Sequence, residues 1–296
     1  MPALQKLVCG EVMDLFLAGA TTTGSIRPLW MGLAEAERSG NMDVYLAGTQ
    51  GRRWCVDELF SQANDANKES NLADISILES FYYADEWTEW AIPRISKFLL
   101  DSGAFTFFSS GKQIDWDEYL TKYINFINKN DVKLFFELDI DPLVGYENVL
   151  KIRKRLEAET GKKCIPVWHK SRGKDEFLKM CDKYEYVALG GIVSKEITRN
   201  EYKYFPWFIN EAHKRGAKIH GLGFTSMSGL AKYHFDSVDS SSWTTGNRFG
   251  FISMFDGKTI KTYDKPKGQS FKSSQAVAIN NFNEWVKFQR YAKSHL

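Results

Sequence analysis

The segment Lys133–His169, KLFFELDIDPLVGYENVLKIRKRLEAETGKKCIPVWH, shows how this chain is built. It begins with the short apolar run Lys133–Asp139 and ends with a second one, Cys164–His169. Between them, Tyr146–Glu159 carries Leu and Ile residues at the spacing of an amphipathic helix. A strand, a helix and a second strand in this order predict two parallel strands joined by a crossover helix.

The same alternation continues on both sides of this segment. Further amphipathic stretches are Trp116–Asn128, Lys174–Tyr184 and Arg199–Arg215. The remaining short apolar runs, rich in β-branched and aromatic residues, are Asp43–Gly48, Ile75–Ser80, Phe98–Asp101, Tyr186–Gly190, Lys218–Leu222 and Phe235–Asp239. Eight such units predict an α/β fold. A closed (β/α)8 barrel of the TIM type is the leading architecture, and an open doubly wound sheet is the alternative.

The two ends of the chain depart from this alternation. Met13–Gly19 resembles Met42–Gly48. This similarity could reflect a small internal duplication. We favour the alternative that Met13–Gly19 is a similar strand in an N-terminal extension, residues 1–41. Near the other end, Phe249–Phe255 and Thr259–Tyr263 flank Asp256-Gly257, which is a strong signal for a two-residue hairpin. A closing helix is expected from about Gln275. Because no low-complexity linker divides the chain, we predict a single barrel domain over 1–296, in which 248–296 form the hairpin and helix.

The composition excludes several classes of protein. A net charge of +2 is too small to indicate a nucleic-acid binder by itself, although 39 Lys and Arg residues leave material for a local basic groove. No apolar run reaches the roughly 18 residues that span a bilayer, and Glu11 and Asp14 interrupt the N-terminal apolar stretch. The four cysteines are far apart and have no CxxC spacing, which favours reduced thiols. We therefore expect a cytoplasmic protein with no membrane partner.

Acidic and polar residues gather where the predicted strands end. In a (β/α) barrel the active site lies at the C-terminal ends of the strands. A carboxylate that closes an apolar strand is costly to bury without a task. A single acid of this kind is equally well explained as a solvated loop residue, but several at one barrel mouth predict a site. The strand ends carry Glu79, Ser80, Asp101, Asp139, Asp141, Trp168, His169, Gly190, Gly191, His220, Gly221 and Asp239.

Paired carboxylates at one mouth indicate cleavage of a glycosidic bond. One carboxylate attacks the anomeric carbon and forms a covalent glycosyl-enzyme, and the other handles the proton of the leaving group. Barrel glycosidases usually bring Glu pairs and Trp residues that stack on sugars, whereas the acids here are mostly Asp. The pattern predicts the bond type without identifying the glycoside.

Several segments between Phe98 and Trp243 resemble the queuine and archaeosine tRNA-guanine transglycosylases, in the order that this family shows. Leu100–Phe105, LDSGAF, is similar to the family's DSGGF segment, and Phe136–Asp141, FELDID, is similar to the strand whose Asp recognises the guanine edge. Leu189–Ile192 resembles the GGL turn whose backbone contacts the base. Two further segments match the strand end before the nucleophile and the VDxFD segment that carries it, namely His220–Gly223 and Phe235–Asp239.

This resemblance implies a role for each residue. Asp239 would attack C1′ of the target nucleoside, with Asp236 as the alternative nucleophile. Asp101 would carry the proton to the departing guanine and from the incoming base, with a helix N-cap as its alternative. Asp139 would accept hydrogen bonds from N1 and N2 of a guanine-like base, which adenine cannot supply. The other expected contacts are stacking by Phe105 and His220, close backbone approach at Gly190 and Gly191, and a substrate contact or a structural role for His169.

Three departures from the family pattern bear on the substrate. The family's CxCxxC…H zinc site follows the nucleophile, but no cysteine follows Asp239 and only His295 remains there, so we expect no metal and no cofactor. Trp168-His169 replaces a glutamine of the family. The basic segment that helps to place tRNA has become Ser240–Thr244. In these departures the chain resembles the divergent phage and bacterial relatives that insert 7-deazaguanine bases into DNA.

The sequence therefore predicts a pentosyltransferase that exchanges guanine for a 7-deazaguanine base, in DNA, through a covalent Asp-ribosyl intermediate. The alternatives are a tRNA-guanine transglycosylase, an N-glycosidase that hydrolyses the same bond, and a non-catalytic nucleic-acid-binding barrel. The target nucleotide would have to leave its stack, and whether an ATPase or helicase partner opens a duplex is left open. Cations expected at the phosphates are Lys170, Arg172, Lys174, Arg248 and the segment Lys258–Lys272.

Overall fold

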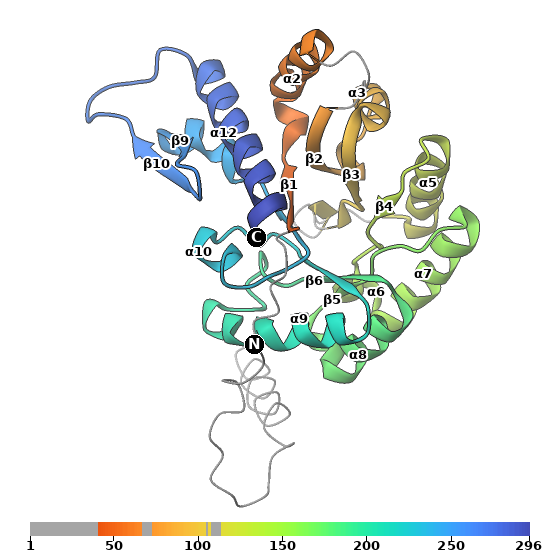
Figure 1. Ribbon diagram of the computed structural model, residues 1–296. Coiled ribbons are helices and arrows are strands. Elements are labelled where there is room, and N and C mark those ends of the chain that lie inside the picture. Colours follow the sequence, from red (N-terminus) through yellow and green to blue (C-terminus); the bar gives the residue numbers. More distant parts are fainter. Residues whose placement is uncertain (1–40, 67–72, 105, 108–113) are drawn as a thin grey trace, which may run out of the picture. The chain divides into compact units, whose positions relative to one another are not determined.

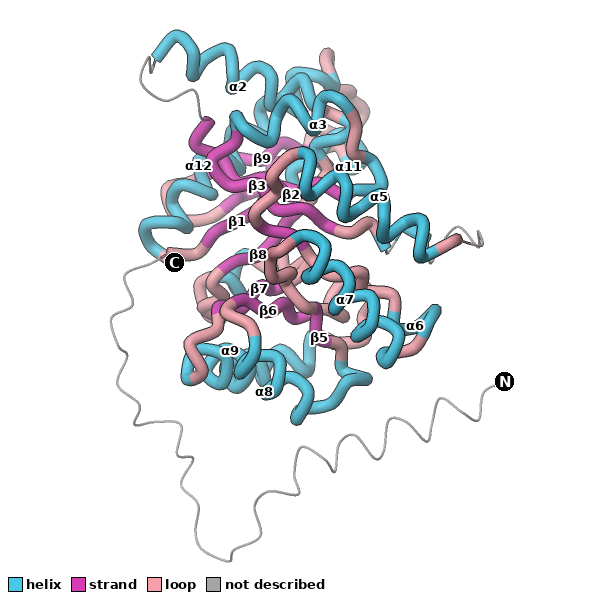
Figure 2. The backbone as a smooth tube through the Cα atoms, turned by 90° about the vertical axis from the view of Figure 1, so that its right-hand side faces the viewer, coloured by secondary structure: helices cyan, strands magenta, loops and turns pink. Residues whose placement is uncertain are grey.

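Eight parallel strands form the centre of the structure, and the longer helices that join them lie outside (Figure 1, Figure 2). The strand order is β4-β3-β2-β1-β8-β7-β6-β5, and a parallel bridge between Phe136 and Ile165 joins its two ends. The ring is therefore closed, which confirms the predicted (β/α)8 barrel and excludes the open sheet. The strands are β1 (Asp43–Ala47), β2 (Ala73–Ser80), β3 (Ile95–Asp101), β4 (Leu134–Phe135), β5 (Val167–Trp168), β6 (Tyr186–Leu189), β7 (Lys218–Gly221) and β8 (Ser237–Ser240).

This computed structural model describes residues 41–66, 73–104, 106–107 and 114–296, all of which belong to the unit Ser39–Leu296. The expected N-terminal extension, except for its last residue, lies outside the described residues, and so does Phe105. None of the described helices combines the length and the apolar composition needed to cross a bilayer.

The predicted helices are present, and one of them is divided. Arg199–Arg215 forms the 3-10 helix η5 (Arg199–Tyr204) followed by α9 (Phe205–Lys214), because Pro206 lies in the first turn of α9 and cannot donate a backbone hydrogen bond. The other helices are α2 (Arg53–Ala66), α3 (Glu86–Ala91), α5 (Trp116–Lys129), α6 (Asp141–Val144), α7 (Tyr146–Thr160), α8 (Gly173–Lys183), α10 (Met227–Leu230), α11 (Gly246–Phe249) and α12 (Ser274–His295), and the short 3-10 turns are η1 (Thr49–Gly51), η2 (Phe81–Tyr83), η3 (Ile92–Arg94), η4 (Lys170–Arg172) and η6 (Ser242–Thr245).

Each strand buries both of its faces, which explains why the strands are nearly continuous apolar runs. In β1, Val44 and Leu46 pack toward the helices, while Tyr45 points into the barrel. The barrel interior is filled by a separate cluster from six strands or their margins, made of Tyr45, Leu78, Leu99, Phe136, Ile165, Val167 and Ala188. The barrel is therefore a packed core and not a pore.

Strands β4 and β5 are shorter than the predicted runs Lys133–Asp139 and Cys164–His169. Pro166 lacks a backbone donor, so the ladder between these strands is interrupted. The fully buried Glu137 compensates, because its Oε1 accepts a hydrogen bond from the Val167 amide at 2.8 Å. Arg153 and Arg172 neutralise this carboxylate at 2.6 and 2.9 Å. A buried ion-pair network thus joins the strands where the backbone ladder is weakest.

The C-terminal hairpin and helix are present as predicted. β9 (Phe251–Phe255) pairs with antiparallel β10 (Ile260–Asp264), and α12 packs against β9 and β1. From α12, the buried Gln289 side chain donates hydrogen bonds to the Val44 and Ser76 carbonyls and accepts one from the Ser76 amide at 3.1 Å. One side chain thereby bridges β1 and β2 before their own pairing begins at Leu46 and Ile77.

Candidate active site

A cavity of about 480 Å³ opens at the C-terminal ends of the barrel strands. Its volume is within the range of small-molecule sites. Among the residues that line it are five predicted from the sequence, namely Asp101, Asp139, His169, Gly191 and Asp239. They come from five different strand ends, so the closed barrel brings together residues that are far apart in the chain.

Asp239, on β8, has its two carboxylate oxygens in different surroundings. Oδ1 accepts hydrogen bonds from the Gly223 amide at 2.5 Å and from His220 Nε2 at 3.2 Å. Among the described residues, no hydrogen-bond donor reaches Oδ2. The carboxylate is therefore fixed through one oxygen, while the other is available to a ligand in the cavity.

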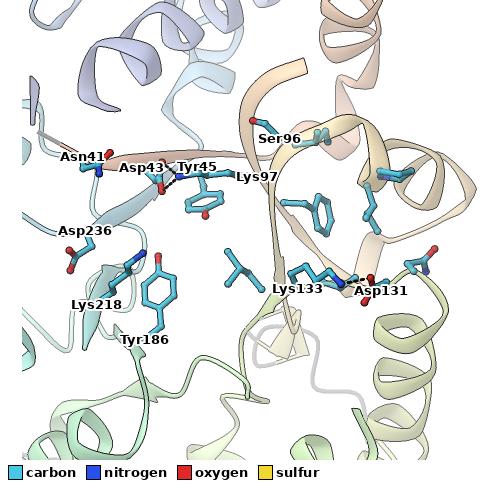
Figure 3. A pocket seen from close by; sticks show the side chains of 17 residues that line it. Asn41, Asp43, Tyr45, Ser96, Lys97, Asp131, Lys133, Tyr186, Lys218 and Asp236 are labelled. Carbon is cyan, nitrogen blue, oxygen red and sulfur yellow. Dashed lines mark hydrogen bonds and ion pairs between the residues drawn. The ribbon is translucent and has the colours of Figure 1, made fainter. Parts of the chain in front are cut away.

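Asp236, the alternative nucleophile, lies at the other end of β8. Its Oδ2 accepts hydrogen bonds from His213 Nε2 and from the Ile219 amide, both at 2.7 Å. It lines a second cavity of about 610 Å³, together with Asp43, Lys97 and Lys218 (Figure 3). Although this cavity is larger, it lies at the N-terminal ends of the strands, where barrels seldom carry catalytic groups.

Asp101, at the end of β3, has a pKa raised to about 6. Burial is the main cause, and the nearby Asp239 and Asp139 carboxylates add to it, although a hydrogen bond from the Gly103 amide at 3.1 Å opposes the shift. This local bond to Gly103 is of the kind that caps a turn. Asp101 also faces the cavity, so the two roles considered for it do not exclude each other.

Asp139, His169 and Glu196 form a linked triplet on one side of the cavity. His169 Nε2 lies 2.7 Å from Asp139 Oδ2, and its Nδ1 lies 2.9 Å from Glu196 Oε2. Burial by itself lowers the pKa of His169, but the two carboxylates outweigh it and raise the pKa to about 10. His169 is thus a charged bridge, and the buried Asp139 Oδ1 has no hydrogen-bond partner in the described structure.

The two glycines after β6 leave room for this triplet. A Cβ on Gly190 would lie 2.9 Å from His169 Cε1. Gly191 has a φ of +82°, and a Cβ there would lie 3.0 Å from Glu196 Oε2. The sequence predicted close backbone approach at both positions, and here the groups that approach are the protein's own side chains. Gly191 also lines the cavity, whereas Gly190 is not among the lining residues.

His220 lies beneath the cavity and has no exposed surface. Its two ring nitrogens face Ser237 Oγ at 2.5 Å and Asp239 Oδ1 at 3.2 Å. The rings of Tyr45 and Phe136 lie 6.1 and 5.3 Å from it. Because no face of the ring reaches the cavity, the stacking role expected for His220 does not fit its position. The residue instead contacts the candidate nucleophile.

Several residues of the site could not be found from the sequence. Glu196 follows β6 in an irregular segment and carries no motif, and Gly223 contributes its amide to Asp239. Arg172, expected at a phosphate, is buried and ion-paired with Glu137 and Asp141. The segment after Asp239 packs inward, because the buried Trp243 donates a hydrogen bond to the Ala47 carbonyl at 2.8 Å.

No cluster of three or more His, Cys, Asp or Glu side chains suited to a metal ion occurs in the part of the chain that the structure describes. The chain matches no family model and no curated protein. Among solved structures it resembles "QR15, an Aldolase", with a TM-score of 0.43 and 11% identity over 69% of this chain and 91% of that chain. A likeness of this size carries no information on activity.

Proposed function

We propose that this chain is a pentosyltransferase that exchanges a guanine in DNA for a 7-deazaguanine base. The observation that carries the proposal is the pair of Asp239 and Asp101 on one cavity, in unlike surroundings. Asp239 has an oxygen with no hydrogen-bond donor among the described residues, and Asp101 has a raised pKa. Two carboxyl groups that differ in this way can divide the roles of nucleophile and proton donor.

The reaction runs through two displacements at C1′ of the target nucleotide. In the first, Asp239 Oδ2 forms a bond to C1′, the bond from C1′ to the guanine nitrogen breaks, and Asp101 gives its proton to the departing base. In the second, a nitrogen of the incoming base attacks C1′ and loses its proton to Asp101. The ester bond to Asp239 then breaks, which restores both carboxyl groups.

The triplet around His169 fits recognition of a guanine-like base. Asp139 Oδ1 is buried without a hydrogen bond, 3.7 Å from Arg172 Nη2, and Oδ2 has a second lone pair besides the one directed at His169. These oxygens can accept the two donors of a guanine edge, and adenine would leave one oxygen unsatisfied. Glu196 and the charged His169 hold Asp139 in place for this task.

The C-terminal hairpin fits a nucleic-acid partner. The segment from Arg248 to Lys272 contains six basic and two acidic residues, and all six basic residues are exposed: Arg248, Lys258, Lys261, Lys265, Lys267 and Lys272. The exposed Phe249 and Tyr263 in the same segment can stack on unpaired bases. Figure 1 shows the hairpin and the loop after it beside α12, outside the barrel. The inward packing of Trp243 favours DNA over tRNA, since a basic tRNA-placing segment is missing there.

An exchange assay tests the proposal. The full-length protein is incubated with labelled guanine and, in parallel, with single-stranded DNA, duplex DNA and tRNA, with Asp239→Asn as the inactive reference. We expect incorporation into DNA that exceeds incorporation into tRNA, and faster incorporation into single strands than into a duplex.

Each other result selects a different function. Incorporation into tRNA alone identifies a tRNA-guanine transglycosylase. Release of free guanine without any incorporation identifies an N-glycosidase. Binding of DNA with neither reaction identifies a non-catalytic barrel. An added ATPase or helicase that raises incorporation into duplex DNA alone would identify the strand-opening partner.

A further inference from the structure

A continuous chain of hydrogen bonds runs through the barrel interior and ends on Asp239. The Tyr186 hydroxyl is bonded to Ser237 Oγ. Ser237 Oγ lies 2.5 Å from His220 Nδ1, and His220 Nε2 lies 3.2 Å from Asp239 Oδ1. Tyr186 also lines the cavity at the N-terminal end of the barrel, where Figure 3 shows it opposite Tyr45. These hydrogen bonds therefore connect the two ends of the barrel.

The strand register produces this alignment. Ser237 and Asp239 are two residues apart on β8, so both side chains point into the barrel, while Val238 between them packs toward the helices. His220 on β7 is directly opposite Ser237, and Tyr186 lies on the next strand, β6. The neighbouring strands β6, β7 and β8 thus each contribute inward-facing polar side chains to this chain of hydrogen bonds.

The chemistry of the groups sets the direction of the chain. The carboxylate of Asp239 can only accept, so His220 Nε2 carries a hydrogen. In a neutral ring, Nδ1 is then an acceptor, and the Ser237 hydroxyl donates to it. The oxygen of Ser237 in turn accepts from Tyr186. Every donor in this series of hydrogen bonds points toward Asp239. Because His220 and Ser237 have no exposed surface, bulk water does not compete for these bonds.

We propose that Tyr186 and Ser237 are positioning residues that hold His220 in its neutral Nε2–H tautomer, and that His220 thereby fixes Asp239 through Oδ1 and presents Oδ2 to C1′. The catalytic part of this inference, the presentation of Oδ2 to C1′, rests on the proposed function. The tautomer itself is a property of the resting protein. The rings of Tyr45 and Phe136 beside His220 limit its rotation, so the hydrogen bonds decide which nitrogen carries the hydrogen.

Nitrogen NMR of the histidine-labelled full-length protein tests the tautomer without any substrate. The chain has five histidines, and the signals of His220 are identified by their loss in His220→Gln. We expect one protonated nitrogen, Nε2, in the wild type. In Ser237→Ala only the 3.2 Å contact with Asp239 still holds the ring, so the Nε2–H tautomer should lose population to other ring states. A doubly protonated ring or an Nδ1–H tautomer in the wild type would overturn the inference.

The exchange assay measures the consequence for Asp239. Ser237→Ala should lower kcat about 5- to 10-fold with little change in KM, which is the effect of losing one neutral hydrogen bond. Tyr186→Phe should lower kcat less, because one step of the chain separates it from His220. The matched control is Ser240→Ala, a buried serine of the same strand that does not contact His220.

The two sets of results separate this inference from the proposed function. If the tautomer is as expected but no DNA exchange occurs in any variant, the proposed function fails and the positioning of the carboxylate stands. If exchange occurs and Ser237→Ala matches Ser240→Ala in kcat and leaves the tautomer unchanged, the positioning role is wrong and the proposed function stands.

Discussion

Asp236 and Asp239 are three residues apart in the sequence, yet they lie in different cavities at opposite ends of one strand. The sequence favoured Asp239, which closes the run Phe235–Asp239, and kept Asp236 as the alternative. What separates them is the direction of β8, since only its C-terminal end reaches the mouth of the barrel. At the scale of single residues, function here depends on which end of the strand a carboxylate occupies.

The covalent step provides the first prediction. With substrate DNA and a poor incoming base, the wild type should form a protein–DNA adduct that survives denaturant. Asp239→Asn removes the attacking oxygen, so it should lower adduct formation and exchange by about 10⁴-fold or more while binding stays largely intact. Denaturing gel electrophoresis and filter binding measure the two effects. Asp236→Asn is the control and should form the adduct; loss of the adduct in Asp236→Asn but not in Asp239→Asn would reverse the assignment.

Asp101 provides a pH dependence. Its pKa of about 6 means that the proton needed by the departing guanine is lost as the pH rises through that value. In single-turnover experiments, the rate of adduct formation should therefore fall about tenfold per pH unit above 6. Asp101→Asn should be slower by about 10²–10⁴-fold and should lack this fall. A fall that persists unchanged in Asp101→Asn would assign the titration to another group.

At the scale of elements, the strands, the irregular segments after them and the C-terminal hairpin make different contributions. The strand ends hold the carboxylates, and the irregular segments after them add Gly223 and Glu196. The hairpin β9–β10 and the loop after it contribute to neither, and they carry exposed lysines, of which Lys261 is ion-paired with Asp256. In the proposed function, recognition of the base and contact with the phosphates would therefore fall to separate elements.

The hairpin and the loop after it provide the prediction at this scale. Lys258, Lys267 and Lys272, all changed to Ala, should weaken DNA binding without changing the rate of base exchange at saturating DNA. Each lost phosphate contact should reduce the slope of log K against log salt by about 0.7 on single strands and 0.9 on duplex DNA. The control changes Lys122, Lys179 and Lys214, which lie on α5, α8 and α9, to Ala. An equal loss in both triple variants would show that the hairpin has no special part.

At the scale of the whole molecule, the sequence predicted the architecture well because each strand and helix has its own periodic pattern. All eight strands and the hairpin appear at the expected positions. Prediction was weaker where contacts depend on distant residues. Glu137 looked like one more strand residue, but it replaces a missing ladder bond and pairs with Arg153 and Arg172.

In the candidate site, too, some residues could be predicted from the sequence and others could not. The acids at strand ends could be predicted, because the barrel fold fixes where strand ends meet. The partners of those acids could not, because Glu196 and Gly223 lie outside the strands and reach the acids only in the folded barrel. The burial of His220 also depends on closure, and its resemblance to a stacking position gave the wrong role for it.

The bridge made by Gln289 has a consequence for how the protein is synthesised. This side chain holds β1 and β2 together from α12, across 245 residues from Val44 and 213 from Ser76. Contacts so distant in sequence form late and slowly during folding. A nascent chain still on the ribosome would therefore carry β1 and β2 without their final connection. Until α12 emerges, the unfinished barrel would expose apolar surface, which favours aggregation.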